Sequence, residues 1–268
     1  MSVTTAFAGS VPTNYDQYLG PVLFEPYAVD LVKRIDTTSY HNVLELACGT
    51  GRVTKHLASM LPVDGSLIAS DLNSDMLNVA RNILPGERIK WMEIDAQDLP
   101  FGDEGFDHVI CQFGVMFFPD KMKAFTESYR VLQPDGRLLF NVWDSLEFNP
   151  RSAIIKQVME EIMGSEAPDF LSKGPYSYYN KNEITTSLRN AGFKNIQLEA
   201  VQKTAYYAFA DDLIKGFVDG SPLNSYLVQQ SPSLQKEIKD KLKQAIVSQF
   251  GETQIISPMQ AIVCSASK

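Results

Sequence analysis

The stretch HNVLELACGTGR, residues 41–52, limits the possible folds of this chain more than any other segment. Residues 43–47 are apolar except for Glu45, as in a strand that is buried on both faces of a parallel sheet. Gly49 and Gly51 follow at once, so the backbone can turn sharply and a ligand can approach without meeting a Cβ atom. Apolar residues then recur at helical spacing. A strand, a glycine turn and a helix N-terminus in this order predict a nucleotide-binding edge.

The glycine spacing separates the classes of cofactor. A dinucleotide fingerprint, G-x-G-x-x-G, would need a third glycine where the chain has Thr54. A P-loop would need Gly-Lys-Ser/Thr, which is also absent. The segment E-L-A-C-G-T-G instead combines an acid inside the strand with a tight G-x-G turn. On this motif alone, a short glycine turn without a ligand stays the structural alternative.

A second acid ends the next apolar segment, residues 66–71. Asp71 follows the glycine loop by roughly twenty residues, the spacing at which a carboxylate at the end of the second strand accepts hydrogen bonds from both ribose hydroxyls. Leu72 comes next, and Met76 suits an apolar wall beside an adenine ring. Asp71 is therefore the predicted ribose ligand.

Two further segments continue the pattern. Residues 89–94 alternate as a third strand and lead into D-A-Q-D-L-P-F, residues 95–101, for which an acidic surface loop is the structural alternative. Residues 105–114 form a fourth strand with Gln112 and Phe113 at its carboxyl end. Ligands of open α/β sheets bind beyond the carboxyl ends of the strands, so both residues are predicted to face the ligand.

These motifs, in this order, resemble the class I S-adenosylmethionine (SAM) dependent methyltransferases, in particular the small-molecule group that includes the ubiquinone and menaquinone biosynthesis enzymes. The resemblance is close over residues 43–143, where L-Q-P-D-G-R at 132–137 is also typical, and looser beyond. It implies an α/β, Rossmann-like fold. The expected sheet has seven mostly parallel strands with helices on both faces, an antiparallel last strand and a helical cap over the active site.

The resemblance also implies SAM as cofactor and S-adenosylhomocysteine as product. Asp95 would accept a hydrogen bond from the exocyclic amine of adenine, Ala96 would donate its N–H to a ring nitrogen, and Gln112 would face the methionine half. Tyr18 is included because the family folds its N-terminal segment over the site as a lid. The predicted cofactor-binding residues are Tyr18, Glu45, Ala47, Gly49, Gly51, Asp71, Leu72, Met76, Asp95, Ala96, Gln112 and Phe113. We predict no metal ligand.

The organisation that we expect is one methyltransferase domain over residues 1–268. Its parts are a lid segment at 1–35, a SAM-binding core at 36–143, and cap segments on the substrate side at 144–192 and 210–252. Patterns typical of strands at 196–209 and 254–264 would complete the sheet.

The predicted reaction is an in-line displacement to a small organic acceptor. Correct orientation can supply about 7 to 11 kcal/mol of the barrier, so no universal catalytic residue is required. None of the three histidines stands clearly at a strand end, and the catalytic base stays unknown. Aromatic and apolar residues fit a flat or apolar acceptor, although each taken singly is more typical of a core. The pocket residues that we predict are Met116, Phe117, Trp143, Tyr178 and Phe217.

Composition narrows the partners. With a net charge of -8, the chain lacks the excess of basic residues that a nucleic-acid-binding protein uses to neutralise phosphates. The sequence has no apolar run long enough for a membrane span, and its three cysteines are far apart, which together favour a cytoplasmic protein. We expect a monomer or homodimer acting on a small molecule. A SAM-binding sensor or regulatory protein without catalysis is the alternative, and a nicotinamide oxidoreductase is disfavoured by Thr54.

Overall fold

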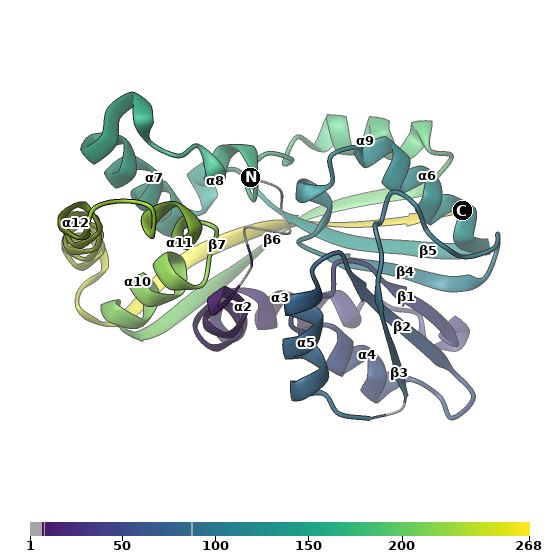
Figure 1. The fold of residues 1–268 in the computed structure, drawn as a ribbon. Helices are drawn as coiled ribbons and strands as arrows, with labels where there is room; N and C mark the ends of the chain where they lie inside the picture. Colours follow the sequence, from purple (N-terminus) through teal and green to yellow (C-terminus); the bar gives the residue numbers. More distant parts are fainter. Residues whose placement is uncertain (1–6, 8, 87) are drawn as a thin grey trace. The chain divides into compact units, whose positions relative to one another are not determined.

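The computed structural model describes residue 7, residues 9–86 and residues 88–268 (Figure 1). Residues 1–6 and 8 of the predicted lid therefore lie outside the described part. The chain divides into two compact units. Unit 1 consists of Met1–Pro26, Asp144–Ser177 and Gln202–Gln260, and unit 2 consists of Tyr27–Trp143, Tyr178–Val201 and Ala261–Lys268.

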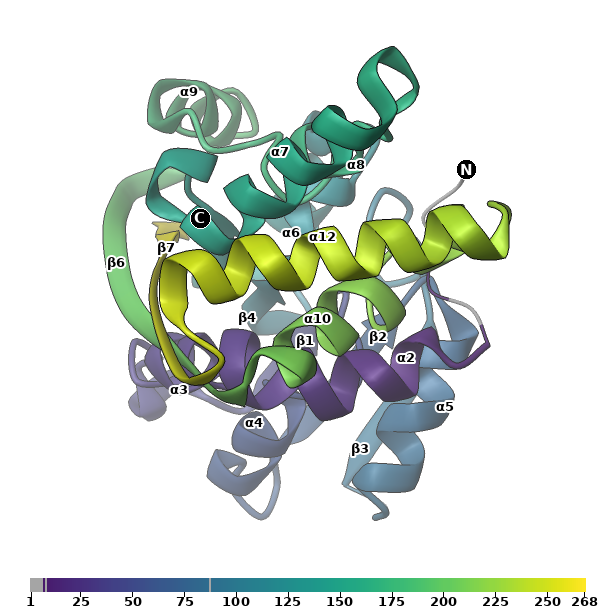
Figure 2. The ribbon, with the colours of Figure 1, turned by 90° about the vertical axis from the view of Figure 1, so that its left-hand side faces the viewer.

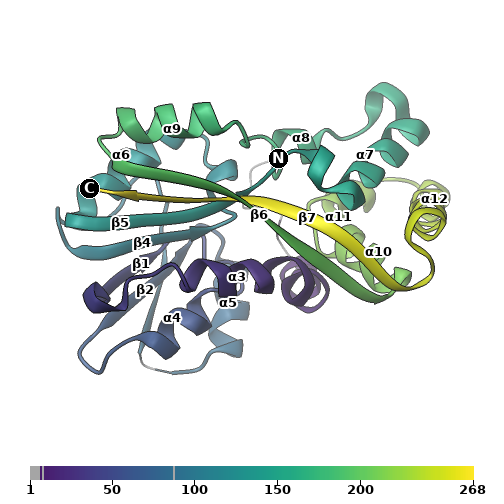
Figure 3. The same cartoon turned by 180° about the vertical axis from the view of Figure 1, so that it is seen from behind.

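The described part of the chain forms one seven-stranded sheet in the order β3-β2-β1-β4-β5-β7-β6. β1 pairs in parallel with both β2 and β4, whereas β5 pairs antiparallel with β7. Figure 3 shows β7 between β5 and β6. This confirms the predicted sheet. The strands are β1 (Asn42–Glu45), β2 (Ser66–Asp71), β3 (Ile89–Glu93), β4 (Phe106–Gln112), β5 (Leu132–Trp143), β6 (Lys194–Phe209) and β7 (Thr253–Ser267).

Helices cover both faces of the unit 2 sheet, as predicted (Figure 1). α3 (Glu25–Val32), α4 (Thr54–Met60) and α5 (Ser74–Ile83) lie on one face, and α6 (Lys121–Val131) and α9 (Lys181–Asn190) lie on the other. Polar side chains fix where several of them begin, because they accept hydrogen bonds from free N–H groups of the first turn. Asn73 does so for α5, Asp120 for α6 and Asn180 for α9.

Burial on both faces explains the apolar strand pattern in the middle of the sheet. Val43 and Leu44 of β1 are fully buried, as are Val109 and Ile110 of the neighbouring β4. Two short 3-10 turns complete this unit, η2 (Thr37–Ser39) before β1 and η3 (Val115–Phe117) after β4. The buried central strands therefore give rigid support to the loops that follow their carboxyl ends.

Unit 1 is mainly helical. α12 packs against both α7 and α10 (Figure 2), and its buried residues Ile238, Leu242 and Ile246 recur every four positions on one face. α10 also approaches η1 closely, since a Cβ atom on Gly216 would lie 2.7 Å from Leu19 Cδ2. Its helices are α2 (Val11–Asn14), η1 (Tyr15–Phe24), η4 (Leu146–Phe148), α7 (Pro150–Met163), η5 (Gly164–Glu166), α8 (Phe170–Lys173), α10 (Ala210–Asp219), α11 (Leu223–Leu227) and α12 (Pro232–Phe250).

The helix η1 is π-helical. Pro21 in its middle has no N–H to donate, and Glu25 N bonds to the carbonyl of Gly20, five residues back. Among the described residues, no helix combines the length and the apolar character that crossing a bilayer requires.

Candidate cofactor-binding site

The predicted cofactor residues of unit 2 stand at the carboxyl ends of four neighbouring parallel strands. In the register of the sheet, Glu45 pairs with Ala69 of β2 and Ile110 of β4, and Asp71 pairs with Glu93 of β3. The strands therefore end along one line, which we name the carboxyl edge. It carries Glu45, Ala47, Gly49 and Gly51 from β1 and its loop, Asp71, Leu72 and Met76 after β2, Asp95 and Ala96 after β3, and Gln112 and Phe113 at β4.

The loop after β1 has a left-handed backbone that few side chains tolerate. φ is 51° at Ala47, 56° at Gly49 and 87° at Gly51. The backbone of Gly51 favours glycine, and a Cβ atom there would also lie 2.9 Å from Leu84 Cδ1, the end of a side chain that would have to shift. A Cβ atom on Gly49 would meet nothing within 4 Å. The loop thus exposes bare backbone to a ligand at Gly49.

Asp71 ties this loop to β2. Its Oδ2 accepts a hydrogen bond from Gly49 N at 2.8 Å, and its Oδ1 accepts one from Asn73 N at 2.8 Å. Burial raises the pKa of this carboxyl, and the backbone N–H donors oppose that effect. A carboxylate has about four lone-pair sites, so both oxygens can accept further hydrogen bonds. Asp71 can therefore hold the loop and receive ribose hydroxyls together.

Glu45 places a carboxyl group in the interior at the end of β1. The residue is 1% exposed, and its Oε2 has no hydrogen-bond partner in the described part of the chain. Burial raises the pKa of Glu45 to about 8, an effect that Thr54 opposes and the charge of Asp71 reinforces. A buried carboxylate is unfavourable without a counter-ion. A cationic ligand at the carboxyl edge would supply one.

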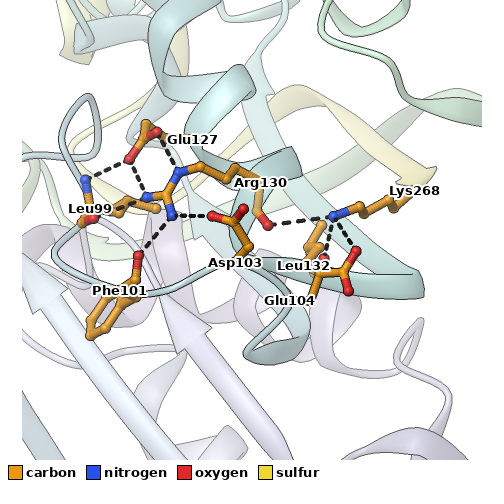
Figure 4. Close-up of polar contacts among 8 residues, drawn as sticks. All are labelled: Leu99, Phe101, Asp103, Glu104, Glu127, Arg130, Leu132 and Lys268. Atoms are coloured by element: carbon orange, nitrogen blue, oxygen red, sulfur yellow. Dashed lines mark hydrogen bonds and ion pairs between the residues drawn. The ribbon is translucent and has the colours of Figure 1, made fainter.

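The loop that follows β3, residues 95–101, is held by two side chains of α6. Arg130 donates hydrogen bonds to the carbonyl oxygens of Leu99 at 3.1 Å and Phe101 at 2.7 Å. Glu127 accepts one from Leu99 N at 2.9 Å and binds Arg130 through both of its oxygens. Figure 4 shows these side chains converging on the loop. α6 thereby fixes the backbone that the sequence predicts to read the adenine.

Arg130 is a positioning residue that the sequence motifs did not reveal. It also pairs with Asp103 at 2.9 Å, and its hydrogen bonds to Glu127 and Asp103 hold its pKa above the ordinary range. Nearby, Lys268 donates a hydrogen bond to the carbonyl of Leu132 at 2.8 Å (Figure 4). The only sequence signal for the role of Arg130 is its spacing from Glu127, three residues earlier on the helix.

Asp95 is fixed within the same loop. Its Oδ1 accepts hydrogen bonds from the backbone N of Gln97 at 2.9 Å and from the side-chain Nε2 at 3.0 Å. Gln97 Oε1 in turn accepts one from Asp120 N at 2.8 Å, which links the loop to the start of α6. Ala96 is buried beside it. Hydrogen bonds to Gln97 therefore fix Asp95, one of the two residues predicted to read the adenine, and Gln97 links the loop to α6.

Aromatic residues gather at the ends of β4 and β5. The rings of Phe113 and Trp143 stack with centroids 4.1 Å apart, and Tyr27 meets both edge-on at 5.5 Å. Phe113 also has a left-handed backbone, with φ of 52°. Such strain in a non-glycine residue is typical of functional sites. All three rings are buried, so Phe113 and Trp143 take part in the core next to the carboxyl edge.

The other predicted pocket residues of unit 2 are buried to different extents. Met116 is buried, Phe117 is partly buried, and Tyr178 is 2% exposed. Lys121 Nζ lies 5.1 Å from the centre of the Tyr178 ring, and burial raises the pKa of this phenol to about 12. Two predicted residues belong to unit 1 instead. They are Tyr18, whose ring lies 4.7 Å from Lys215 Nζ, and Phe217 of α10.

The strand order, the antiparallel β7 and the arrangement of glycines and acids on the carboxyl edge define the class I SAM-dependent methyltransferase fold. Residues 44–140 match the family described as Methyltransferase domain. The match covers less than half of the chain, and over these residues the chain is similar to that family, as its motifs predict.

Curated relatives match over part of their length. A ubiquinone/menaquinone biosynthesis C-methyltransferase of Haemophilus ducreyi is 30% identical over 167 residues, which cover 58% of this chain and 64% of that protein. The corresponding enzyme of a Marinomonas species is 37% identical over 124 residues, 44% of this chain and 47% of that protein. The chain thus spans less than two thirds of either relative.

Solved structures share the fold at low identity. Phosphoethanolamine N-methyltransferase 2 of Haemonchus contortus, in complex with S-adenosyl-L-methionine, is 16% identical with a TM-score of 0.62, covering 98% of this chain and 58% of that chain. A SAM-dependent methyltransferase of Aquifex aeolicus is 18% identical with a TM-score of 0.52, covering 71% of this chain and 91% of that chain.

Proposed function

We propose that this protein transfers the methyl group of SAM to a small organic acceptor by in-line displacement. The sulfonium of SAM supplies the activated methyl group. The contribution of the chain is to bind the cofactor at the carboxyl edge and to hold an acceptor in line with it. The observation that carries the proposal is the glycine loop after β1, tied by Gly49 N to Asp71 at the end of β2.

The residues present suit this cofactor in charge and in shape. Asp71 would accept hydrogen bonds from the ribose, and Asp95 with Ala96 would read the adenine beside Leu72 and Met76. Glu45 would balance the positive charge of the methionine half, because its buried Oε2 lacks a partner among the described residues. The other groups proposed to contact the cofactor are Ala47, Gly49, Gly51, Gln112, Phe113 and, from unit 1, Tyr18.

The fold does not determine which molecule accepts the methyl group. The names of the relatives pair this architecture with a C-methyltransferase in one case and a phosphoethanolamine N-methyltransferase in another. We propose a small acceptor bound by Met116, Phe117, Trp143, Tyr178 and Phe217, in a cytoplasmic protein that works as a monomer or homodimer. The residues 144–192 and 210–252 would form its substrate side.

No histidine takes the part of a general base in this proposal. Burial lowers the pKa of His108 to about 4, so the ring is neutral near pH 7. His108 pairs in the sheet with Val43, two residues before the end of β1, and therefore lies inside the strand rather than at the carboxyl edge. A nucleophilic acceptor needs no base for transfer from a sulfonium.

Calorimetric titration with SAM and S-adenosylhomocysteine tests the cofactor. Both should bind the wild type, and Asp71→Ala should weaken both by about 10-fold or more, because charge-assisted hydrogen bonds are lost. Asp64→Ala, which removes an exposed acid before β2, is the matched control. Failure of both ligands to bind, or equal binding by Asp71→Ala, would refute the site.

A second assay separates catalysis from binding alone. Methyl transfer from radiolabelled SAM to any member of a metabolite panel would exclude a SAM-binding sensor or regulatory protein. Tight binding without transfer to any acceptor would favour that alternative. Titration with NADH, for which we expect no binding, addresses the oxidoreductase class.

A further inference from the structure

Unit 1 buries a cation that the cofactor site does not use. Arg151, in the first turn of α7, is 1% exposed, yet its Nε and Nη1 have no hydrogen-bond partner among the described residues. The first turn of α7 carries no acid. A guanidinium stays protonated in proteins, and a buried charge without a partner is strongly unfavourable. Two of the three guanidinium nitrogens of Arg151 therefore keep N–H donors that no described residue accepts.

Two phenols of the same unit interact electrostatically with this guanidinium. Tyr207 of β6 is 3% exposed, and its hydroxyl has no hydrogen-bond partner within the described residues. The Tyr176 hydroxyl lies 2.7 Å from Ser152 Oγ. Burial raises the pKa of Tyr207 to about 12 and also raises that of Tyr176, while the charge of Arg151 acts against both effects. Both hydroxyls are therefore protonated donors near Arg151, which we name together the Arg151 cluster (Arg151, Tyr176 and Tyr207).

The start of α7 is held firmly in place. Asn149 Nδ2 donates to the carbonyl oxygens of Asp144, Ser145 and Gln260 at 3.2, 3.0 and 3.2 Å. Asn149 Oδ1 accepts a hydrogen bond from Gln260 N at 3.2 Å and makes no side-chain cap, so the positive end of the helix dipole is not compensated by a cap. Asp144, a buried acid of this network, accepts from Gln260 Nε2 at 2.8 Å and from Ser145 N at 2.8 Å. Its carboxylate is thus engaged away from Arg151.

We propose that the Arg151 cluster of unit 1 binds the carboxylate group of a small monocarboxylic acid. Arginine suits a planar carboxylate, to which it can donate two parallel hydrogen bonds. The cluster has one positive charge and two neutral donors, which balance one negative charge. A phosphate group, with about -1.5 to -2 charges at neutral pH, would need a second cation.

Binding of simple anions to the full chain tests the assignment. We would titrate the protein calorimetrically with benzoate, with acetate, with uncharged benzamide and with inorganic phosphate. Benzoate and acetate should bind, benzamide should not, and phosphate should bind more weakly than benzoate. Arg151→Met should weaken benzoate binding by about 10-fold to 100-fold, because hydrogen bonds to a charged group are lost. Arg151→Lys should recover part of it, since the charge is kept.

Two controls separate a binding role from a structural one. Lys156→Met removes another cation of α7, one that already pairs with Glu160, and should leave benzoate binding unchanged. Arg151→Met should unfold at the same temperature as the wild type or higher, because it removes an unpaired buried charge. A lower unfolding temperature together with unchanged benzoate binding would identify Arg151 as a structural cation and overturn the proposal.

Other outcomes also decide the matter. Absence of carboxylate binding at millimolar concentration, equal binding of benzoate and benzamide, or tighter binding of phosphate would each overturn the assignment. SAM titration of the same variants distinguishes the two hypotheses. Loss of the carboxylate site leaves SAM binding intact, whereas a wild-type chain that does not bind SAM refutes the proposed function instead.

Discussion

Replacing Glu45 by glutamine should stabilise the protein at neutral and alkaline pH. Burial raises the pKa of this carboxyl from its ordinary value of 4.5 to about 8. In the unfolded chain the same group ionises near its ordinary value. Between these two pH values the folded protein binds a proton that the unfolded chain has released. The free energy of unfolding must therefore fall as the pH rises through this window, and it is highest below it.

The size of the effect follows from the two pKa values. One pKa unit corresponds to about 1.36 kcal/mol, so keeping this carboxyl in the folded state costs on the order of 5 kcal/mol above pH 8. Glutamine has nearly the same shape and no charge to bury. The free energy of unfolding of the wild type should thus decline by up to about 1.4 kcal/mol per pH unit relative to that of Glu45→Gln.

Urea unfolding at several pH values from about 5 to about 8 measures this difference. Glu93→Gln, which changes an exposed acid at the end of β3, is the matched control and should run parallel to the wild type. Parallel pH profiles of wild type and Glu45→Gln would refute the reasoning. If Glu45 balances the cationic half of the cofactor, the stabilised variant should also bind SAM more weakly, and wild-type binding near pH 7 should release a proton.

Four more substitutions test how the sites are built. Arg130→Ala should cost about 1 to 3 kcal/mol of unfolding free energy and weaken SAM binding, because the loop at 95–101 loses its support; hydrogen exchange of that loop should accelerate. Gly51→Ala should cost about 1 to 3 kcal/mol of unfolding free energy through backbone strain and contact with Leu84. Gly49→Ala should lose only the part that comes from backbone strain. Chemical denaturation measures both. Tyr207→Phe should leave the unfolding temperature unchanged or higher while weakening benzoate binding in calorimetry.

The residues of the carboxyl edge could be predicted from the sequence, because each is marked by its close neighbours in the chain. The strand before the glycine loop is recognisable because central parallel strands are apolar on both faces, as Val43 and Leu44 are. Gly49 and Gly51 mark a left-handed turn that other residues rarely adopt. Asp71 follows from its spacing along one strand-helix-strand unit. Each of these signals depends on neighbours in the chain, so the sheet and the residues on its edge could be predicted without coordinates.

The tertiary structure alone decided which polar groups are supported and which are left without a partner. Arg130 of α6 donates hydrogen bonds to the loop after β3, although strand β4 and most of α6 separate the two in the chain. No sequence motif encodes these contacts. Arg151 reads in the sequence as an ordinary helix cation that water would surround. Only the folded structure shows that Arg151 is buried and that it interacts with the phenols of Tyr176 and Tyr207. Its Nε and Nη1 have no hydrogen-bond partner among the described residues. Burial and charge balance are sums over residues far apart in the chain, and a sequence pattern records only what is near.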